Sequence, residues 1–256
     1  MTTYVALSTP LSTPLAVRNH VRTDVPAGVL ADPPADPPAM EVTLRVDGAE
    51  PLSAGLVAEL HRTCDRAEDA DLPVRVLLRL SGTPRGDTTG SLTITLVNSW
   101  ERALRRLERL EALTVALVDG DIGGTAVEAL LVTDHRVAAR HLRVTLPRAS
   151  GQAWPGMSLY RLSRQVGETA ARRALRGRPI WSEEAQRLGL VDELVDSTPA
   201  TEEGWSSRLP VPAPDTALRR SLVLNASSLS FEDALGVHLA ACDRTLRGAA
   251  RTEEPA

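Results

Sequence analysis

One stretch constrains the fold of this chain more than any other: residues 115 to 134, with the sequence VALVDGDIGGTAVEALLVTD. It begins with four apolar residues, a length typical of a buried strand. A tight turn with Gly120, Gly123 and Gly124 follows, and the apolar run after the turn is interrupted only by Glu128. Two glycines, a small residue and an apolar run predict a helix that starts close against the preceding strand.

This predicted helix start has a chemical consequence. The first turn of a helix leaves backbone N–H groups unpaired at the positive end of the helix dipole, and such a terminus can hold an oxyanion. Glu128 is a lone carboxylate in an apolar helix, where desolvation should raise its pKa and suit it to proton transfer. The same residues are also compatible with a glycine-rich turn that has Glu128 on a solvated helix edge, and the stretch alone leaves both interpretations open.

Length and composition set wider bounds. A chain of 256 residues that is 43% hydrophobic can build a substantial core, in one large domain or two small ones. The formal net charge of −4 gives no indication of nucleic-acid binding or of an anionic membrane surface. Cys64 and Cys242 belong to no metal-binding or redox spacing, so we expect reduced thiols in a cytoplasmic protein without a metal site. We predict no signal peptide and no transmembrane segment.

The order of the predicted elements indicates the fold class. Strands alternate with helices, which predicts an α/β fold with a parallel sheet. We expect strands at 41–46, 74–80, 115–118, 134–139, 142–146 and 190–195, and helices at 52–67, 98–113, 158–166, 216–226 and 231–247, with further helices after Gly167 and from Ser182. The dipeptide Asp47-Gly48 closes the first strand and predicts a hairpin or a turn.

Composition also divides the chain. Residues 1–39 contain seven prolines and no apolar periodicity, which predicts a flexible tail. We expect a folded core at 40–196, a Pro- and Ser-rich linker at 197–215 and a helical region at 216–256. On the predicted helix at 98–113, charges of both signs recur at helical spacing. We interpret that pattern as a solvated face with ion pairs three or four residues apart, not as a binding patch.

Three motifs, in this order along the chain, resemble those of the crotonase superfamily, the enoyl-CoA hydratase/isomerase fold. The first runs from Asp119 through the glycine turn and Glu128 to Asp134-His-Arg-Val-Ala138. The second is residues 154–167, WPGMSLYRLSRQVG, and the third is residues 180–193, IWSEEAQRLGLVDE. The resemblance covers roughly residues 41 to 196. It implies repeated ββα units in a twisted spiral, a C-terminal helical region, and assembly into a homotrimer or hexamer.

The resemblance also implies a site. The family holds the enolate of a CoA thioester with two backbone N–H groups, which fall here on Thr89, before Gly90, and on Thr125, after Gly124. Glu128 matches one of the family's two catalytic glutamates. We therefore expect Glu128, Thr89 and Thr125 to be catalytic, with Gly90 and Gly124 contacting the substrate. No metal or redox cofactor is implied, because the CoA thioester is itself the substrate.

Arg148 departs from the family pattern. It follows Pro147, where the family's second catalytic glutamate usually falls, and an arginine cannot exchange a proton near pH 7. Arg148 could anchor a thioester oxygen, a phosphate or a carboxylate of the substrate, or it could be a surface arginine at a strand end. Trp154 is expected in the core or in the wall of the substrate pocket.

More narrowly, the chain resembles the crotonase homologues of 3,5-dihydroxyphenylglycine biosynthesis, which accompany a type III polyketide synthase in the formation of glycopeptide-type antibiotics. That resemblance implies an acyl-CoA dehydratase or isomerase acting on a polyketide-derived CoA thioester. The competing interpretation is a catalytically degenerate crotonase that binds and stimulates the synthase. The absence of the second carboxylate argues against an ordinary enoyl-CoA hydratase of fatty-acid breakdown.

Overall fold

The computed structural model describes residues 39–86, 92–146, 148–149, 152–153, 156–174, 176–197 and 215–252. These residues belong to one compact unit, Pro37–Ala256. The predicted N-terminal tail, apart from residue 39, lies outside the described residues, as does most of the predicted linker.

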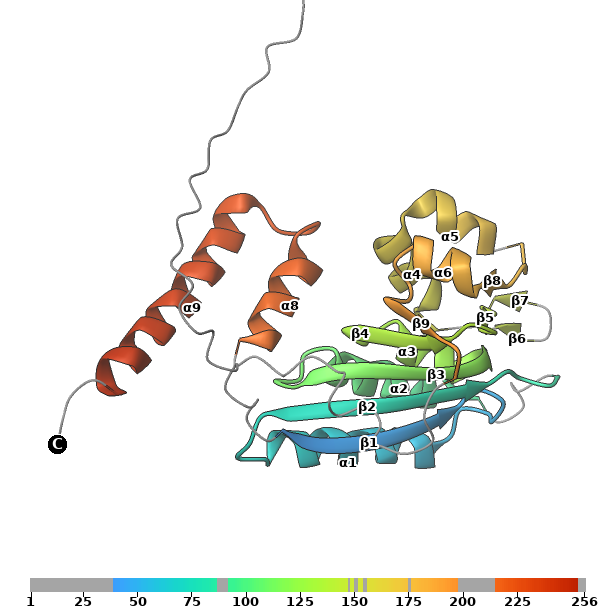
Figure 1. Cartoon of the computed structure of the whole chain (residues 1–256), viewed down its shortest axis with the longest axis horizontal. Helices are drawn as coiled ribbons and strands as arrows, with labels where there is room; N and C mark the ends of the chain where they lie inside the picture. The colour runs from blue at the N-terminus through green and yellow to red at the C-terminus, as the bar shows by residue number, and fades with distance from the viewer. Residues whose placement is uncertain are drawn as a thin grey trace, which may run out of the picture. The chain divides into compact units, whose positions relative to one another are not determined.

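A mainly parallel sheet forms the centre of the molecule (Figure 1). Its principal strands are β1 (Met40–Asp47), β2 (Val74–Gly82), β3 (Leu113–Ile122), β4 (His135–Ala139) and β9 (Glu193–Val195), in the order β1-β2-β3-β4-β9 with all neighbours parallel. Two shorter strands extend it, β5 (Arg143–Val144) beside β3 and β8 (Ile180–Trp181) antiparallel to β5. A separate antiparallel pair is formed by β6 (Arg148–Ala149) and β7 (Gln152–Ala153). The predicted α/β class with a parallel sheet is confirmed.

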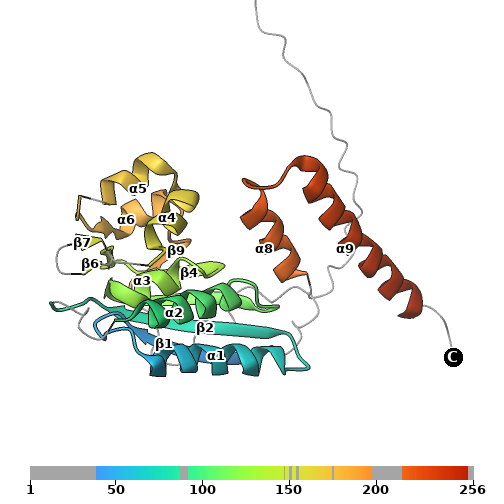
Figure 2. The same ribbon diagram turned by 180° about the vertical axis from the view of Figure 1, so that it is seen from behind.

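Helices cover the sheet. Figure 2 shows α1, α2 and α3 on the same face of it, and their apolar side chains share one buried cluster with β1, β2 and β3. The helices are α1 (Ala54–Glu68), α2 (Ile94–Leu107), α3 (Gly124–Leu130), α4 (Ser158–Val166), α5 (Glu168–Ala174), α6 (Ser182–Arg187), α8 (Thr216–Asn225) and α9 (Phe231–Thr252). None of the helices that the structure describes is both long and apolar enough to cross a membrane.

The boundaries of α2 differ from the prediction of 98–113. The helix begins four residues earlier because the Thr93 side chain accepts a hydrogen bond from the Leu96 N–H (3.1 Å), which satisfies a free donor of the first turn. It ends at Leu107, and the chain enters β3 at Leu113 because Leu113 pairs with Arg75 of β2. The apolar residues that continue the helical spacing beyond Leu107 therefore belong to a turn and a strand.

The sequence predicts a hairpin or a turn after the first strand, and only the turn is present after β1. Asp47-Gly48 does form a turn, in which Asp47 Oδ1 accepts a hydrogen bond from the Ala49 N–H (2.9 Å). It does not form a hairpin, because β1 pairs in parallel with β2 and the chain must cross over through α1 to reach it. The local sequence predicts the turn, whereas the parallel pairing with β2 determines that the connection runs through a helix.

The centre of the sheet is buried on both faces. On β3, Ala116 and Val118 belong to the cluster under the helices, whereas Val115 and Leu117 belong to a second buried cluster. This alternation follows from the two-residue period of a strand. It explains why β3 shows a continuous apolar run, as interior parallel strands do.

The two cysteines should differ in reactivity. Cys64 on α1 is fully buried, and burial raises the pKa of its thiol to about 11, so it holds almost no thiolate at pH 8. Cys242 on α9 is partly exposed, and both thiols are free. We expect iodoacetamide to alkylate Cys242 in the native protein and to reach Cys64 only after unfolding, as read by mass spectrometry of the digested protein. Equal alkylation of both cysteines in the native state would contradict this assignment.

Candidate active site

The glycine turn places the start of α3 directly against the ends of neighbouring strands. The Gly123 N–H donates to the Gly82 carbonyl oxygen at 2.9 Å. Gly124 has a φ of +51°, and a Cβ there would lie 2.7 Å from the Gly48 carbonyl oxygen. A side chain at this position would meet both backbone strain and a backbone clash, so only glycine allows the approach.

Backbone donors are available at this helix start. The N–H groups of Ala126 and Val127 donate to the Gly123 carbonyl at 3.1 and 3.4 Å, whereas those of Gly124 and Thr125 have no backbone acceptor within the described chain. Thr125 is buried, and its hydroxyl oxygen has no hydrogen-bond partner there either. A buried amide at the positive end of a helix dipole is the type of donor that stabilises an oxyanion. The oxyanion role of Thr125 stays a prediction, which is supported by its burial and by its backbone donor at the helix start, free among the described residues.

Glu128 lies at the junction of three helices. Its side chain, on α3, is 0% exposed. The Trp100 indole N–H on α2 donates to Oε2 at 2.8 Å, and the Ser158 hydroxyl at the start of α4 donates to Oε1 at 3.2 Å. The interpretation that placed Glu128 on a solvated helix edge is therefore wrong, because α2 and α4 enclose that edge.

A second acidic contact fixes the start of α4. Glu101 Oε1 accepts a hydrogen bond from the Met157 N–H at 2.9 Å, and its other oxygen pairs with Arg161 Nη2 at 2.8 Å. The sequence alone did not predict that Trp100 and Ser158 bind Glu128, or that Glu101 and Arg161 form a pair beside the start of α4. The signal available for Trp100 was its place in line with the apolar face of α2, which indicates burial but names no partner.

Comparison with known proteins places these features in a family. Residues 90–207 match the enoyl-CoA hydratase/isomerase family profile. Over 209 residues the chain is 45% identical to an enoyl-CoA hydratase of Amycolatopsis orientalis, a match that covers 81% of this chain and 96% of that protein. The chain belongs to the enoyl-CoA hydratase/isomerase family. The resemblance to the crotonase superfamily is thereby confirmed.

Solved enoyl-CoA hydratases share the fold. The enoyl-CoA hydratase of Bacillus anthracis has a TM-score of 0.66 at 20% identity, with 83% of this chain and 90% of that chain covered. An enoyl-CoA hydratase/isomerase of Cupriavidus metallidurans has a TM-score of 0.63 at 22% identity, with 77% and 80% covered. At these identities the likeness concerns the fold alone.

Other predicted site residues are only partly placed. Thr89, Gly90 and Trp154 lie outside the described residues, so the second oxyanion donor of the enoyl-CoA hydratase/isomerase site is not located. The backbone of Arg148 lies in β6, opposite Ala153 of β7, whereas its side chain lies outside the described part. Arg148 thus belongs to a short strand of its own, after the sheet strand β5 has ended at Val144. Within the described ranges, no group of three or more His, Cys, Asp or Glu residues is arranged to hold a metal ion.

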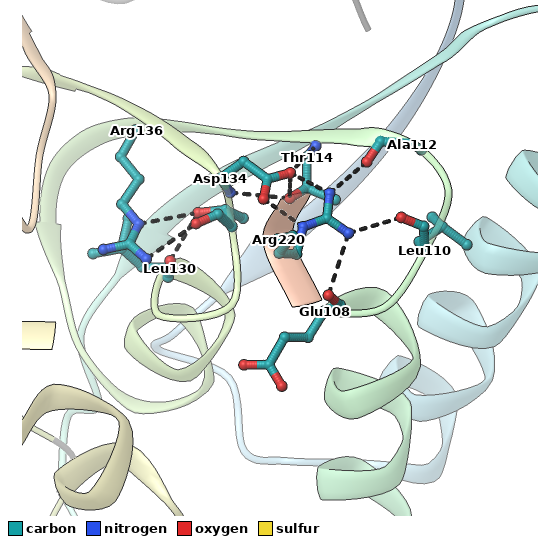
Figure 3. Close-up of polar contacts among 9 residues, drawn as sticks. Glu108, Leu110, Ala112, Thr114, Leu130, Asp134, Arg136 and Arg220 are labelled. Atoms are coloured by element: carbon teal, nitrogen blue, oxygen red, sulfur yellow. Dashed lines mark hydrogen bonds and ion pairs between the residues drawn. The ribbon is translucent and has the colours of Figure 1, made fainter. Parts of the chain in front are cut away.

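Asp134 and Arg136, from the first family motif, make polar contacts that join the start of β4 to neighbouring segments (Figure 3). Asp134 Oδ2 accepts hydrogen bonds from the N–H and hydroxyl of Thr114 at 2.9 and 2.8 Å, and Asp134 also binds Arg220 of α8. The Arg136 guanidinium donates to the Thr133 carbonyl oxygen at 3.0 Å. Burial lowers the pKa of Arg136 to about 10, so it remains charged at neutral pH.

Proposed function

We propose that this enoyl-CoA hydratase/isomerase family member acts on a polyketide-derived acyl-CoA thioester, as a dehydratase or double-bond isomerase on the way to 3,5-dihydroxyphenylacetyl-CoA. The observation that carries the proposal is that Thr125 and Glu128 lie close together on α3. They are three residues apart, so the Thr125 amide, which has no backbone acceptor among the described residues, and the buried carboxylate lie within one helical turn of each other. That spacing suits a donor for an enolate oxygen and a base for the adjacent carbon.

In the proposed reaction the Thr125 N–H, with the Thr89 N–H as second donor, stabilises the enolate oxygen of the thioester. The Glu128 carboxylate takes the proton next to the thioester carbonyl. Protonated Glu128 then returns that proton to the departing hydroxyl, which leaves as water, or to another carbon, which moves the double bond. One carboxylate that acts first as base and then as acid makes a second glutamate unnecessary, which accommodates Arg148 at that position.

A second function is favoured by a specific observation. Glu128 is fully enclosed and bound by Trp100 and Ser158, an environment that also suits a packing residue. Together with Arg148 in place of the second glutamate, this favours a crotonase-fold protein that binds a type III polyketide synthase and raises its turnover without performing chemistry.

The Glu128→Gln variant separates the two functions. Its side-chain carbonyl can still accept from Trp100 and its amide can donate to the Ser158 oxygen, so the fold is kept while proton exchange is lost. We expect the variant no longer to stimulate formation of the dihydroxyphenyl product from malonyl-CoA by the synthase. The rate of the step that Glu128 catalyses should fall by about 10²- to 10⁴-fold.

The matched control is Glu59→Gln, on an exposed part of α1, which should stimulate like wild type. Thermal unfolding and binding to the synthase would verify that the Glu128 variant is folded and still associates. Full stimulation by that variant would overturn the enzymatic function and favour the binding function. Rapid hydration of crotonyl-CoA by the wild type would instead indicate an ordinary hydratase.

We further propose that the protein works in the cytoplasm as a homotrimer or hexamer. The support for assembly lies in α8 and α9. No residue of α8 is buried, and α9 leaves large apolar side chains in solvent, with Phe231 75% exposed and Leu246 70% exposed. Contact with other copies would remove this apolar surface from water. Analytical ultracentrifugation would distinguish the trimer from the hexamer and from a monomer.

A further inference from the structure

A cavity of about 1150 Å³ lies between the core and α8. Its walls come from the exposed side of α2, from α4, from the turn after α3 and from α8. Residues 131–134, which follow the C-terminal end of α3, line the cavity, whereas the Gly123–Thr125 turn at the N-terminal end does not. The cavity is thus separate from the donors proposed to hold the enolate.

The lining of this cavity is rich in positive charge. It contains eight arginines and four carboxylate residues, which leaves a formal excess of four positive charges. The arginines are Arg102, Arg105, Arg109, Arg136, Arg161, Arg164, Arg219 and Arg220. Guanidinium groups are weakly hydrated and present paired N–H donors, which match the oxygens of phosphate and carboxylate groups.

Three of these arginines form an unpaired stripe. Arg102, Arg105 and Arg109 are exposed, and none of their guanidinium groups makes an ion pair or hydrogen bond within the described parts of the chain. Their spacing of three and four residues places them on one side of α2 and the turn that follows it. The expectation of pairs three or four residues apart on this helix is therefore wrong. Arg106 instead reaches Asp65 and Glu68 on α1.

A buried donor in the same wall also lacks a partner. Arg161 is only 7% exposed, and its Nη2 pairs with Glu101. Its Nη1 is buried, and no residue that the structure describes supplies it with a hydrogen-bond acceptor. Such groups are rare in folded proteins, because a buried N–H without an acceptor loses its bond to water and gains none in return. An oxygen of a bound ligand would supply the acceptor.

We propose that this cavity binds a phosphate-bearing small molecule. The three arginines of the stripe contact its phosphate oxygens, and Arg161 Nη1 donates to the most deeply placed oxygen. A multiply charged group fits the four excess positive charges better than a single carboxylate does.

Isothermal titration of the full chain with sodium pyrophosphate tests this proposal. We expect one site per chain, and about tenfold weaker binding by the triple variant Arg102→Gln/Arg105→Gln/Arg109→Gln. The matched control is Arg172→Gln/Arg173→Gln/Arg176→Gln, which removes the same charge from exposed positions in and after α5 and should bind within about twofold of wild type. No binding by the wild type, or equal weakening in both triple variants, would overturn the proposal.

Titration with coenzyme A then identifies the source of the phosphate. If coenzyme A, like pyrophosphate, binds about tenfold more weakly to the stripe variant than to wild type, the cavity holds the nucleotide end of a thioester. Coenzyme A binding that the stripe variant leaves unchanged, beside weakened pyrophosphate binding, would assign it to a separate phosphate-bearing molecule.

Discussion

Gly48→Ala is expected to lower the free energy of unfolding by about 3 kcal/mol, at the upper end of the usual cost of overpacking. A Cβ at this position would lie 2.1 Å from the Gly123 carbonyl oxygen and 2.6 Å from the Gly82 carbonyl oxygen. Neither oxygen can move alone, because the Gly82 carbonyl accepts the Gly123 N–H at 2.9 Å. The turn before α3 would have to shift as a unit.

The same shift should impair function, because Thr125 lies two residues after Gly123 and its N–H would move with the turn. Urea unfolding would give the loss of stability, and the proposed stimulation of the synthase, measured at a temperature where the variant is folded, would give the loss of function. Gly55→Ala on the exposed side of α1 is the control, since a Cβ there meets only the Ser53 hydroxyl oxygen at 3.6 Å. Unfolding of both variants at the urea concentration of the wild type would refute the packing argument.

Arg220→Ala is expected to cost about 3 kcal/mol, the lower end of the range for removing one partner of a buried ion pair, because the Asp134 side chain is still 20% exposed. The Arg220 side chain is 8% exposed and pairs with both oxygens of Asp134. It also donates to the carbonyl oxygens of Ala112, Leu110 and Glu108 at 2.6, 2.7 and 3.2 Å. Truncation would leave a partly buried carboxylate and three carbonyl groups without this donor (Figure 3).

The loss should concentrate on α8, because Arg220 joins α8 to the end of α2 and the start of β4. Hydrogen exchange of residues 216–225, followed by mass spectrometry, should become faster in the variant than in wild type. Arg164 of α4 would still donate to the Leu224 carbonyl oxygen of α8 at 2.8 Å. We therefore expect α8 to become more mobile but to stay attached to α4. Arg219→Ala is the matched control, since its side chain is 72% exposed and pairs with exposed Asp215. Unchanged exchange in the Arg220 variant would contradict its anchoring role.

Features that depend on a few neighbouring residues could be predicted from the sequence. The glycine turn and the start of α3 follow from Gly123 and Gly124, because a close backbone approach and a positive φ both require glycine. The α/β class follows from apolar runs of strand length that alternate with helical spacing. The apolar run around Glu128 suggested proton transfer, and the family motifs matched that residue to a catalytic glutamate.

Tertiary structure alone decided what surrounds those residues. Trp100 and Ser158 lie 28 and 30 residues from Glu128, and Arg220 lies 86 residues from Asp134. Hydrophobic periodicity indicates that a side chain is buried, but it carries no information about which distant group faces it. The sequence therefore determined the turn, the helix and the carboxylate of the candidate site. Only the packing of α2 and α4 decided that this carboxylate is enclosed. Only the packing of α8 beside them decided that an arginine-lined cavity lies at the far end of its helix. Both results depend on contacts between segments far apart in the chain.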